Sequence, residues 1–508
     1  MNPISKLLAK IPKNIQFRRK NLLWSCLIIL GLTLTQISSY LPIATAQQPS
    51  FASPREFRGA WVASVANIDW PSKPGLPVFQ QKAELLNILN RMQELNLNAL
   101  VLQVRPNGDA LYNSNIEPWS GWLTGKQGTP PNPYYDPLEF AIAESHKRNI
   151  ELHAWFNPYR ARLSPNDGPF ASNHAAVKYP QYAYRYGKNI WLDPGAKVIQ
   201  DQTYNTIMDV VRRYDIDAIH FDDYFYPYPQ GGAEFPDYDT YNSYRASGGT
   251  LSLSNWRRQN VNTMVERLYR GIHAEKPYVK FGISPFGIYR PGIPPGIVGL
   301  DQYNEIYADV KLWLEKGWVD YLAPQLYWRI DPPQQSYPVL LNWWLQQNLQ
   351  RRHIYAGNYL SQLQTSGWSI SEFERQVAIS RQRASQLSLG NIFFSMKMFR
   401  DNVAGVNNVF KSSIYPTPAL PPAMPWLDNQ PPAAPTGVQV NSGVISWNVD
   451  KTGDVRSWAL YQQTGNQWVL SQVLNSDTNG VRVSPGTYAL RAVDRLANES
   501  VEEVVTVQ

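Results

Sequence analysis

Short apolar runs rich in β-branched and aromatic residues alternate with longer amphipathic stretches from residue 56 to about residue 411. Eight such units occur, and their expected strands are residues 57–65, 99–105, 151–157, 218–224, 280–286, 320–328, 353–359 and 391–399. Helical periodicity is clear at residues 80–95, 137–147, 197–213, 254–275, 301–316 and 371–387. Eight consecutive strand–helix units predict an α/β protein, a (β/α)8 TIM barrel over residues 54–411. A doubly wound open sheet is the alternative, but no glycine-rich phosphate loop follows the early strands.

The fourth expected strand ends in two adjacent carboxylates, Asp222 and Asp223. Side chains alternate between the faces of a strand, so His220, Asp222 and Tyr224 share one face and apolar residues occupy the other. Active sites of parallel barrels lie at the carboxyl ends of the strands, which aims Asp222 into a pocket. Asp223 should face away unless the strand twists at its end. The alternative, that the pair caps a turn, accounts for one Asp but not for His220 beside it.

Polar and aromatic residues gather at the other expected strand ends and in the loops that follow them. The expected substrate-binding residues are Arg105, His153, Trp155, Asn157, Tyr159, Arg160, His220, Tyr224, Gln325, Tyr327 and Trp328. Aromatic rings stack on the C–H face of a pyranose, while amide, carboxylate and guanidinium groups bond its hydroxyls. The combination predicts a saccharide-binding site at the barrel mouth.

Hydrolysis of a glycosidic bond normally uses two carboxyl groups that flank the bond. Asp222 is the first choice for the nucleophile or base. Three basic side chains are expected to keep it ionised: Arg105, His153 or His220. The second carboxyl stays open among the acids near the predicted mouth: Asp223, Asp109 and, more weakly, Glu117 and Asp331. The fifth and sixth strands lack the acids that many barrel glycosidases carry there, which leaves room for a substrate-assisted mechanism with an acetamido nucleophile.

Residues 1–46 have the pattern of a secretory signal peptide: cationic residues, the apolar run 22–34, and then Ala44-Thr-Ala46. An uncleaved anchor is the alternative, although a spanning helix needs about 20 apolar residues. We therefore expect an exported protein, periplasmic or extracellular and associated with the cell envelope, without stable membrane insertion after cleavage. Six Lys and Arg and no acid lie in this segment, so the formal net charge of +7 falls to +1 and gives no electrostatic case for nucleic acid.

The sequence offers few candidate residues for metal binding or thiol chemistry. The only cysteine, Cys26, lies inside the expected signal peptide, and no His, Cys or acid cluster has the spacing of metal ligands. We expect neither a metal nor another cofactor.

Proline-rich sequence follows the eighth unit, at residues 412–435, and predicts a stiff linker. Residues 436–508 then alternate apolar and polar residues between turn signals, as in Val444-Ile-Ser-Trp-Asn448. This pattern predicts a C-terminal β-sandwich similar to a fibronectin type III module. We interpret Trp447 as a core residue rather than a sugar-binding one, because it lies within the alternating pattern.

Five motifs in order resemble the glycosyl hydrolase-like 10 family: Phe57-Arg-Gly-Ala-Trp-Val62, Gln103-Val-Arg-Pro-Asn-Gly-Asp-Ala-Leu-Tyr112, Glu117-Pro-Trp-Ser-Gly-Trp-Leu-Thr-Gly125, Leu152-His-Ala-Trp-Phe-Asn-Pro-Tyr-Arg-Ala161 and His220-Phe-Asp-Asp-Tyr-Phe-Tyr-Pro227. The resemblance implies an exported bacterial (β/α)8 barrel that acts on glycan, and one branch of the family is linked to peptidoglycan strands stripped of their peptides. A related family that cleaves partly deacetylated poly-N-acetylglucosamine has a similar Phe-His-Asp-Asp strand end. This supports Asp222 and Asp223 as the catalytic region.

These observations favour a glycoside hydrolase for an amino-sugar polymer of the cell envelope, with peptide-free peptidoglycan glycan strands as the expected polysaccharide. One alternative is a glycan-binding protein on a barrel without turnover, which the missing acids on strands five and six favour. Another is a hydrolase of a poly-N-acetylglucosamine-type exopolysaccharide. Amide or ester hydrolysis is disfavoured, because the sequence has no Gly-x-Ser-x-Gly elbow, catalytic cysteine or histidine-rich metal site.

Overall fold

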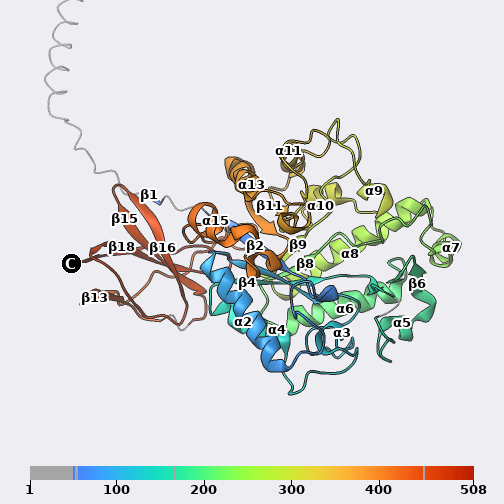
Figure 1. The fold of residues 1–508 in the computed structure, drawn as a ribbon, viewed down its shortest axis with the longest axis horizontal. Helices are drawn as coiled ribbons and strands as arrows, with labels where there is room; N and C mark the ends of the chain where they lie inside the picture. Colours follow the sequence, from blue (N-terminus) through green and yellow to red (C-terminus); the bar gives the residue numbers. More distant parts are fainter. Residues whose placement is uncertain (1–49, 52–54, 165–166, 450–451) are drawn as a thin grey trace, which may run out of the picture. The chain divides into compact units, whose positions relative to one another are not determined.

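A closed barrel of eight parallel strands forms the main part of the computed structural model (Figure 1), which describes residues 50–51, 55–164, 167–449 and 452–508. Around the barrel the strands run in the order β2 (Phe57–Val62), β3 (Ala99–Arg105), β4 (Glu151–Phe156), β8 (Ala218–Phe221), β9 (Lys280–Ile283), β10 (Tyr321–Leu322), β11 (His353–Asn358) and β12 (Ser388–Phe393). The predicted barrel is confirmed. The expected signal peptide, residues 1–46, lies outside the described residues.

Helices cover the outside of the barrel (Figure 1). They are α2 (Val78–Glu94), α4 (Pro137–His146), α6 (Lys197–Arg213), α8 (Leu253–Glu275), α10 (Val310–Lys316), α11 (Tyr337–Gln347) and α13 (Ile370–Gln382). Helix α2 shows why they form, because its buried residues Leu85, Ile88, Leu89 and Met92 recur at helical spacing and face the strands.

Several expected elements are shorter than the sequence pattern suggested. The expected strands 57–65, 218–224, 280–286 and 391–399 end at Val62, Phe221, Ile283 and Phe393, and α14 (Met396–Arg400) occupies the end of the last one. The expected helix 301–316 is divided into α9 (Gln302–Glu305) and α10, because Tyr307 adopts a left-handed conformation (φ 56°) and Asp309 caps the new helix through Leu312 N. The expected strand 320–328 ends at Leu322, and Pro324 follows, which has no N–H to donate to a ladder.

Strand alternation sorts the barrel side chains as predicted. The buried residues of the lumen lie at every second position of their strands and include Phe57, Trp61, Ala99, Val101, Trp155, Ala218, Tyr321, Tyr355 and Ile392. Leu100, Leu102 and Leu152 lie on the opposite strand faces, in the core beneath the helices. The lumen is therefore a packed interior, and chemistry is confined to its ends.

The proline-rich segment after the barrel closes the base of the lumen and does not run free. Met424 is 1% exposed and joins the lumen core. The Trp426 indole N–H donates to Asp320 Oδ1 at 2.9 Å, and its ring lies edge-on to His353 at 4.8 Å. The linker interpretation of residues 412–435 is thus too simple for this part, which packs on the barrel as a plug.

Two antiparallel sheets form the C-terminal region and confirm the predicted β-sandwich. One contains β13 (Gln439–Asn441), β14 (Val444–Ser446) and β17 (Gly480–Arg482). The other contains, in order, β1 (Ser50–Phe51), β16 (Gln467–Asn475), β15 (Ser457–Thr464), β18 (Gly486–Val493) and β19 (Glu503–Val507). Both sheets contribute to one core, in which Trp447 and Trp458 lie 5.8 Å apart. Trp447 is a core residue, as its position in the sequence indicated.

Candidate active site

Asp222 and Asp223 are both buried just beyond the end of β8. The strand ends at Phe221, so strand alternation no longer governs the two acids. Asp223 therefore does not face away as expected: its Oδ2 accepts a hydrogen bond from the Tyr228 hydroxyl, and the Gln325 amide from the sixth unit also bonds it. The two carboxyl groups belong to one cluster.

Three groups donate to Asp222. The Trp155 indole N–H donates to Oδ2 at 3.0 Å, and the Asn157 amide donates to the same oxygen. The backbone N–H of Tyr224 donates to Oδ1 at 3.2 Å. Trp155, Asn157 and Tyr224 were all expected at the site, and the structure brings them to Asp222.

The orientation of the Asn157 amide is fixed by its other contacts. Its Oδ1 accepts from Gln103 Nε2 at 2.6 Å and from Arg160 Nη2 at 2.7 Å, so its nitrogen must point to Asp222. Arg160 is buried and also donates to Asn107 Oδ1 at 3.1 Å. A hydrogen-bonded chain thus runs from the loop after β3 to the carboxyl pair.

Both acids bind a proton more tightly than an ordinary carboxyl group. Burial, followed by the negative charge of Asp223, raises the pKa of Asp222 to about 7. Burial also raises the pKa of Asp223, and hydrogen bonds from Tyr228 and Gln325 oppose this rise. The positive charge of Arg160 favours the ionised form of both acids. Asp222 therefore holds a proton at a pH where an ordinary carboxyl has lost it.

Arg105 and Glu117 form an ion pair of their own below the mouth. Both side chains are fully buried, and Arg105 Nε donates to Glu117 Oε2 at 2.7 Å. Arg105 also donates to the backbone carbonyl oxygens of Asn157 and Pro158. Its charge is thus engaged in holding the loops after β3 and β4, and no hydrogen bond joins it to Asp222 in the described residues. Glu117 is likewise engaged and is not a free catalytic acid.

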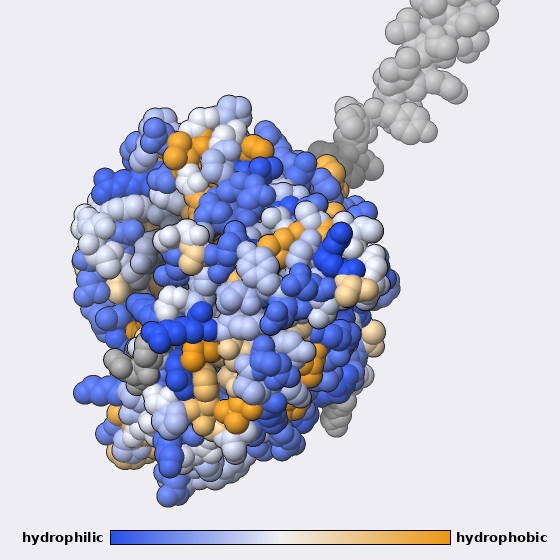
Figure 2. All heavy atoms as spheres, turned by 90° about the vertical axis from the view of Figure 1, so that its right-hand side faces the viewer, coloured by the Kyte–Doolittle hydropathy of each residue, from blue (hydrophilic) through white to orange (hydrophobic). Residues whose placement is uncertain are grey.

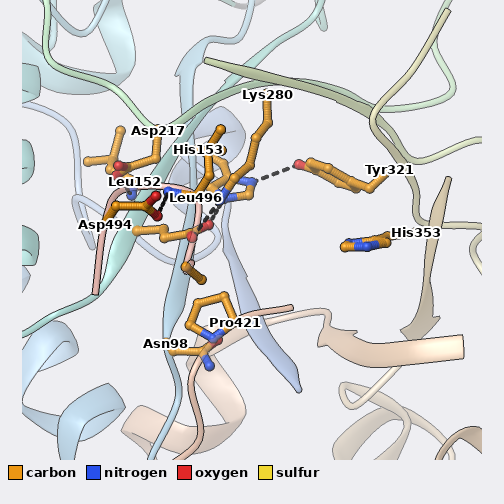
Figure 3. A network of polar contacts seen from close by, with 12 residues as sticks. Asn98, Leu152, His153, Asp217, Lys280, Tyr321, His353, Pro421, Asp494 and Leu496 are labelled. Carbon is orange, nitrogen blue, oxygen red and sulfur yellow. Dashed lines mark hydrogen bonds and ion pairs between the residues drawn. The ribbon is translucent and has the colours of Figure 1, made fainter. Parts of the chain in front are cut away.

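His153 and His220 lie deeper in the lumen and are joined through Tyr321. Figure 3 shows the bond between His153 and Tyr321. The Trp61 indole N–H can only donate, so His220 Nε2 accepts it at 3.1 Å and the His220 proton is on Nδ1. That Nδ1–H donates to the Tyr321 hydroxyl at 2.9 Å, which in turn donates to His153 Nδ1 at 2.8 Å. His153 Nε2–H then donates to Glu151 Oε2 at 2.9 Å. We call these five residues the axial chain.

The axial chain is a structural feature of the lumen. Burial lowers the pKa of His220 well below its ordinary value, so its ring is neutral. Burial opposes ionisation of Glu151, but Lys280 and His153 outweigh it and lower the pKa of this acid. Neither histidine touches Asp222 through a hydrogen bond, and both are fully buried. The structure therefore places both histidines inside the lumen, bonded to Tyr321 and not to Asp222.

A cavity of about 300 Å³ lies at the base, where Glu151 and Asn98 face the C-terminal region. Figure 3 shows this end of the barrel, with Asn98, Pro421 and Asp494 among the residues that line the cavity. None of the described side chains that line the cavity is aromatic. It lacks the stacking surfaces of a sugar site and lies at the opposite end of the barrel from Asp222.

Three other predicted residues are not brought to the carboxyl pair. Asp109 is buried in the loop after β3, where it accepts from Gln127 Nε2 at 3.0 Å and from Asn107 N at 3.2 Å, and burial raises its pKa to about 6. Tyr159 is fully buried and offers no surface to a substrate. The Asp331 side chain is 74% exposed and lies 3.3 Å from Arg375. Asp222 and Asp223 therefore form a pair at the strand end, whereas Asp109 is hydrogen-bonded within its own loop.

Half-buried aromatic rings surround the carboxyl pair. Tyr327 and Tyr359 lie 4.8 Å apart, Tyr224 and Tyr228 lie 5.6 Å apart, and Trp328 contacts Phe286 edge-on at 5.5 Å. Tyr224, Tyr327, Trp328 and Tyr359 were expected among the aromatic residues at the barrel mouth, whereas Tyr228 and Phe286 were not assigned to the site. Tyr228 could have been found, since it follows Asp223 by five residues in the same aromatic run.

The face that carries α7 (Tyr238–Ala246) and β6 (Ala183–Tyr186), on the right in Figure 1, is polar over most of its area, with hydrophobic residues in small separate patches (Figure 2). Over the residues that the structure describes, no group of three or more His, Cys, Asp and Glu could hold a metal ion. In the same residues, no helix has both the length and the apolar character needed to cross a membrane.

Known proteins resemble this chain along most of its length. The glycosyl hydrolase YngK of Bacillus subtilis (strain 168) is 39% identical over 476 residues, which cover 88% of this chain and 92% of YngK. The glycosyl hydrolase DigH of Escherichia coli (strain K12) is 36% identical over 323 residues, which cover 60% of this chain and 72% of DigH.

Solved structures are similar at a lower level. The catalytic domain of β-amylase from Paenibacillus polymyxa is 11% identical with a TM-score of 0.48, covering 72% of this chain and 99% of that one. The PgaB (BpsB) glycoside hydrolase domain from Bordetella bronchiseptica is 12% identical with a TM-score of 0.45, covering 70% and 98%. These scores bear on neither substrate nor mechanism. The family model described as Glycosyl hydrolase-like 10 matches residues 56–371, so the chain belongs to this family and is a glycoside hydrolase.

Proposed function

We propose that the protein hydrolyses glycosidic bonds in an amino-sugar polymer of the bacterial cell envelope, and that peptide-free peptidoglycan glycan strands are its substrate. The observation that carries the proposal is the pair Asp222 and Asp223, buried together beside half-exposed tyrosine and tryptophan rings. The rings offer stacking surfaces to successive sugars, and the pair offers a proton and a negative charge at one place.

The proton on Asp222 suits it to act as the general acid, in place of the nucleophile or base expected from the sequence. Burial and the charge of Asp223 raise its pKa to about 7, which keeps a proton available near neutral pH. Asp223 is the stronger candidate for the ionised partner, because Tyr228 and Gln325 stabilise its carboxylate.

The site supports a substrate-assisted reaction, because the two acids are adjacent on one loop and the other carboxyl groups considered are engaged or remote. In the first step, Asp222 donates its proton to the glycosidic oxygen while the 2-acetamido oxygen attacks the anomeric carbon and the C–O bond breaks. The ionised Asp223 stabilises the positive charge that develops on the acetamido group. In the second step, water attacks the anomeric carbon, the acetamido ring opens, and the Asp222 carboxylate takes the proton from water.

Digestion of purified glycan strands tests this proposal. The protein from residue 47 onward, its Asp222→Asn variant and its Asp223→Asn variant would be incubated with peptide-free peptidoglycan strands, and the products would be read by mass spectrometry. We expect cleavage by the unsubstituted protein and at least 100-fold slower cleavage by both variants. Cleavage of poly-N-acetylglucosamine but not of peptidoglycan strands would assign the other polymer, and unchanged cleavage by Asp222→Asn would refute the role of the pair.

A thiazoline analogue of the bicyclic acetamido intermediate tests the mechanism separately. A substrate-assisted enzyme binds this analogue more tightly than the substrate, because the analogue resembles the intermediate. A glycosyl-enzyme adduct on an aspartate, detected by mass spectrometry of the trapped protein, would instead show a protein nucleophile.

We also propose that residues 1–46 direct export and that the protein acts in the periplasm or outside the cell. The cationic start, the apolar run and Ala44-Thr-Ala46 support this proposal. Sequencing of the N-terminus of the protein recovered from the cell envelope would give residue 47 as the first residue. Recovery of the protein in the cytoplasm with its first 46 residues intact would refute export.

A further inference from the structure

We infer that Tyr228 is a positioning residue that keeps Asp223 in its ionised form. Its hydroxyl donates to Asp223 Oδ2, so it favours the ionised form of Asp223. The inference rests on the proposed function of the pair as an acid and an ionised partner, and it adds a residue that acts on the reaction through Asp223.

The position of Tyr228 is set by aromatic packing. Its ring meets Tyr224 edge-on at 5.6 Å and Phe286 at 6.3 Å. Burial, followed by the charge of Asp223, raises the pKa of Tyr228 far above its ordinary value, so the hydroxyl keeps its hydrogen at any working pH. Tyr228 is therefore a permanent donor to Asp223.

Asp222 accepts hydrogen bonds of its own from Trp155, Asn157 and the Tyr224 N–H, so Tyr228 acts against these donors when it favours an ionised Asp223. The charged and titratable groups around the pair do not distinguish the two acids. Arg160 attracts both carboxylates. Tyr224 and Tyr327 lie close enough to sense both charges, but no hydrogen bond joins their hydroxyls to either acid in the described residues. The Gln325 amide also lowers the pKa of Asp223, so it acts in the same direction as Tyr228.

The asymmetry has a chemical consequence. An ionised Asp223 raises the pKa of Asp222 through its charge and so maintains the general acid. Without the Tyr228 hydroxyl, the pKa of Asp223 rises toward that of Asp222, and one proton is shared between two nearly equivalent sites. The acid and the ionised partner are then each present for only part of the time.

The experiment is a titration of the free protein labelled with ¹³C at aspartate carboxyl carbons, compared with its Tyr228→Phe variant. Spectra of Asp222→Asn and Asp223→Asn identify the two signals. We expect the lower of the two transitions to move upward by about one pH unit in Tyr228→Phe, because a hydrogen bond to a carboxylate lowers its pKa by roughly that amount. Tyr226→Phe is the control, since this fully buried ring packs on Phe235 and Tyr307 and lies outside the site.

Kinetics on the cleaved glycan supply a second readout. We expect Tyr228→Phe to lower kcat by roughly tenfold or more with little change in KM, and to shift the acid limb of the pH profile upward. Unmoved carboxyl transitions in Tyr228→Phe would overturn the inference, whatever the activity. Moved transitions in a protein that cleaves no glycan would support the inference and refute the proposed function.

If Tyr228→Phe does not fold, Gln325→Leu tests the same assignment, because it removes the other side-chain donor to Asp223 and should move the same transition in the same direction.

Discussion

Replacing Tyr321 by Phe removes one hydroxyl that joins two buried histidines. The hydroxyl accepts from His220 Nδ1 at 2.9 Å and donates to His153 Nδ1 at 2.8 Å, and Tyr321 is fully buried. His220 cannot adopt the other tautomer without losing the bond from Trp61. Both nitrogens would therefore be left without a partner. An unsatisfied buried polar group costs about 1–3 kcal/mol, so we expect a loss of about 2–6 kcal/mol in the free energy of unfolding.

Tyr355→Phe is a matched control for this prediction. Tyr355 belongs to the same lumen core, is also buried, and its hydroxyl bonds one nitrogen, His353 Nδ1, at 2.9 Å. Urea unfolding followed by tryptophan fluorescence, with equal m values, should show about twice the loss for Tyr321→Phe as for Tyr355→Phe. A loss below about 1 kcal/mol for Tyr321→Phe, or a loss no larger than that of the control, would refute the directed axial chain.

Three further predictions concern single residues. The pKa of Asp222 is raised from 3.8 to about 7, so the folded protein binds this proton more tightly than the unfolded chain and loses stability as the pH rises through this range. Asp222→Asn should therefore gain stability over the unsubstituted protein between pH 4 and 7 in unfolding experiments, and an equal pH dependence of both would contradict the raised pKa. Glu117→Gln should lose about 3–5 kcal/mol in denaturant unfolding, because it leaves the buried Arg105 without its counter-ion. Lost turnover at unchanged stability would instead make Glu117 a catalytic acid. Met424→Ala should lose about 2–5 kcal/mol in the same assay, since Met424 fills the base of the lumen. An unchanged midpoint would show that residues 412–435 act only as a linker.

Much of the fold could be predicted, because barrel strands and helices carry their periodicity locally. The bounds Ala99–Arg105 and Lys197–Arg213 agree with the structure residue by residue. The wrong predictions fall beyond the end of a strand or at contacts between distant parts of the chain. Strand alternation predicted that Asp223 faces away, but β8 stops before it. The pattern also gave no sign that Met424 enters the lumen, since that contact joins residues far apart in the chain.

The residue types of the candidate site could be predicted, but not how deep in the barrel each side chain lies. Alternation placed His153, His220 and Asp222 on one inward face, and all three do point inward. It could not show that both histidines are hydrogen-bonded to Tyr321 inside the lumen, while Asp222 lies at the barrel mouth. Likewise, the charge of Arg105 is visible in the sequence, but its pairing with Glu117 depends on how the loop after β3 folds back.

The plug at the base of the barrel affects when the barrel can finish folding during synthesis of the chain. Met424 and Trp426 are translated after all eight strands, yet Met424 is needed to fill the lumen that those strands enclose. A nascent chain that has emerged only to residue 411 would present an open-ended barrel with Phe57 and Tyr355 uncovered. The last step of assembly therefore waits for the C-terminal end of the chain, and a truncation designed at the apparent domain boundary would leave the core unfinished.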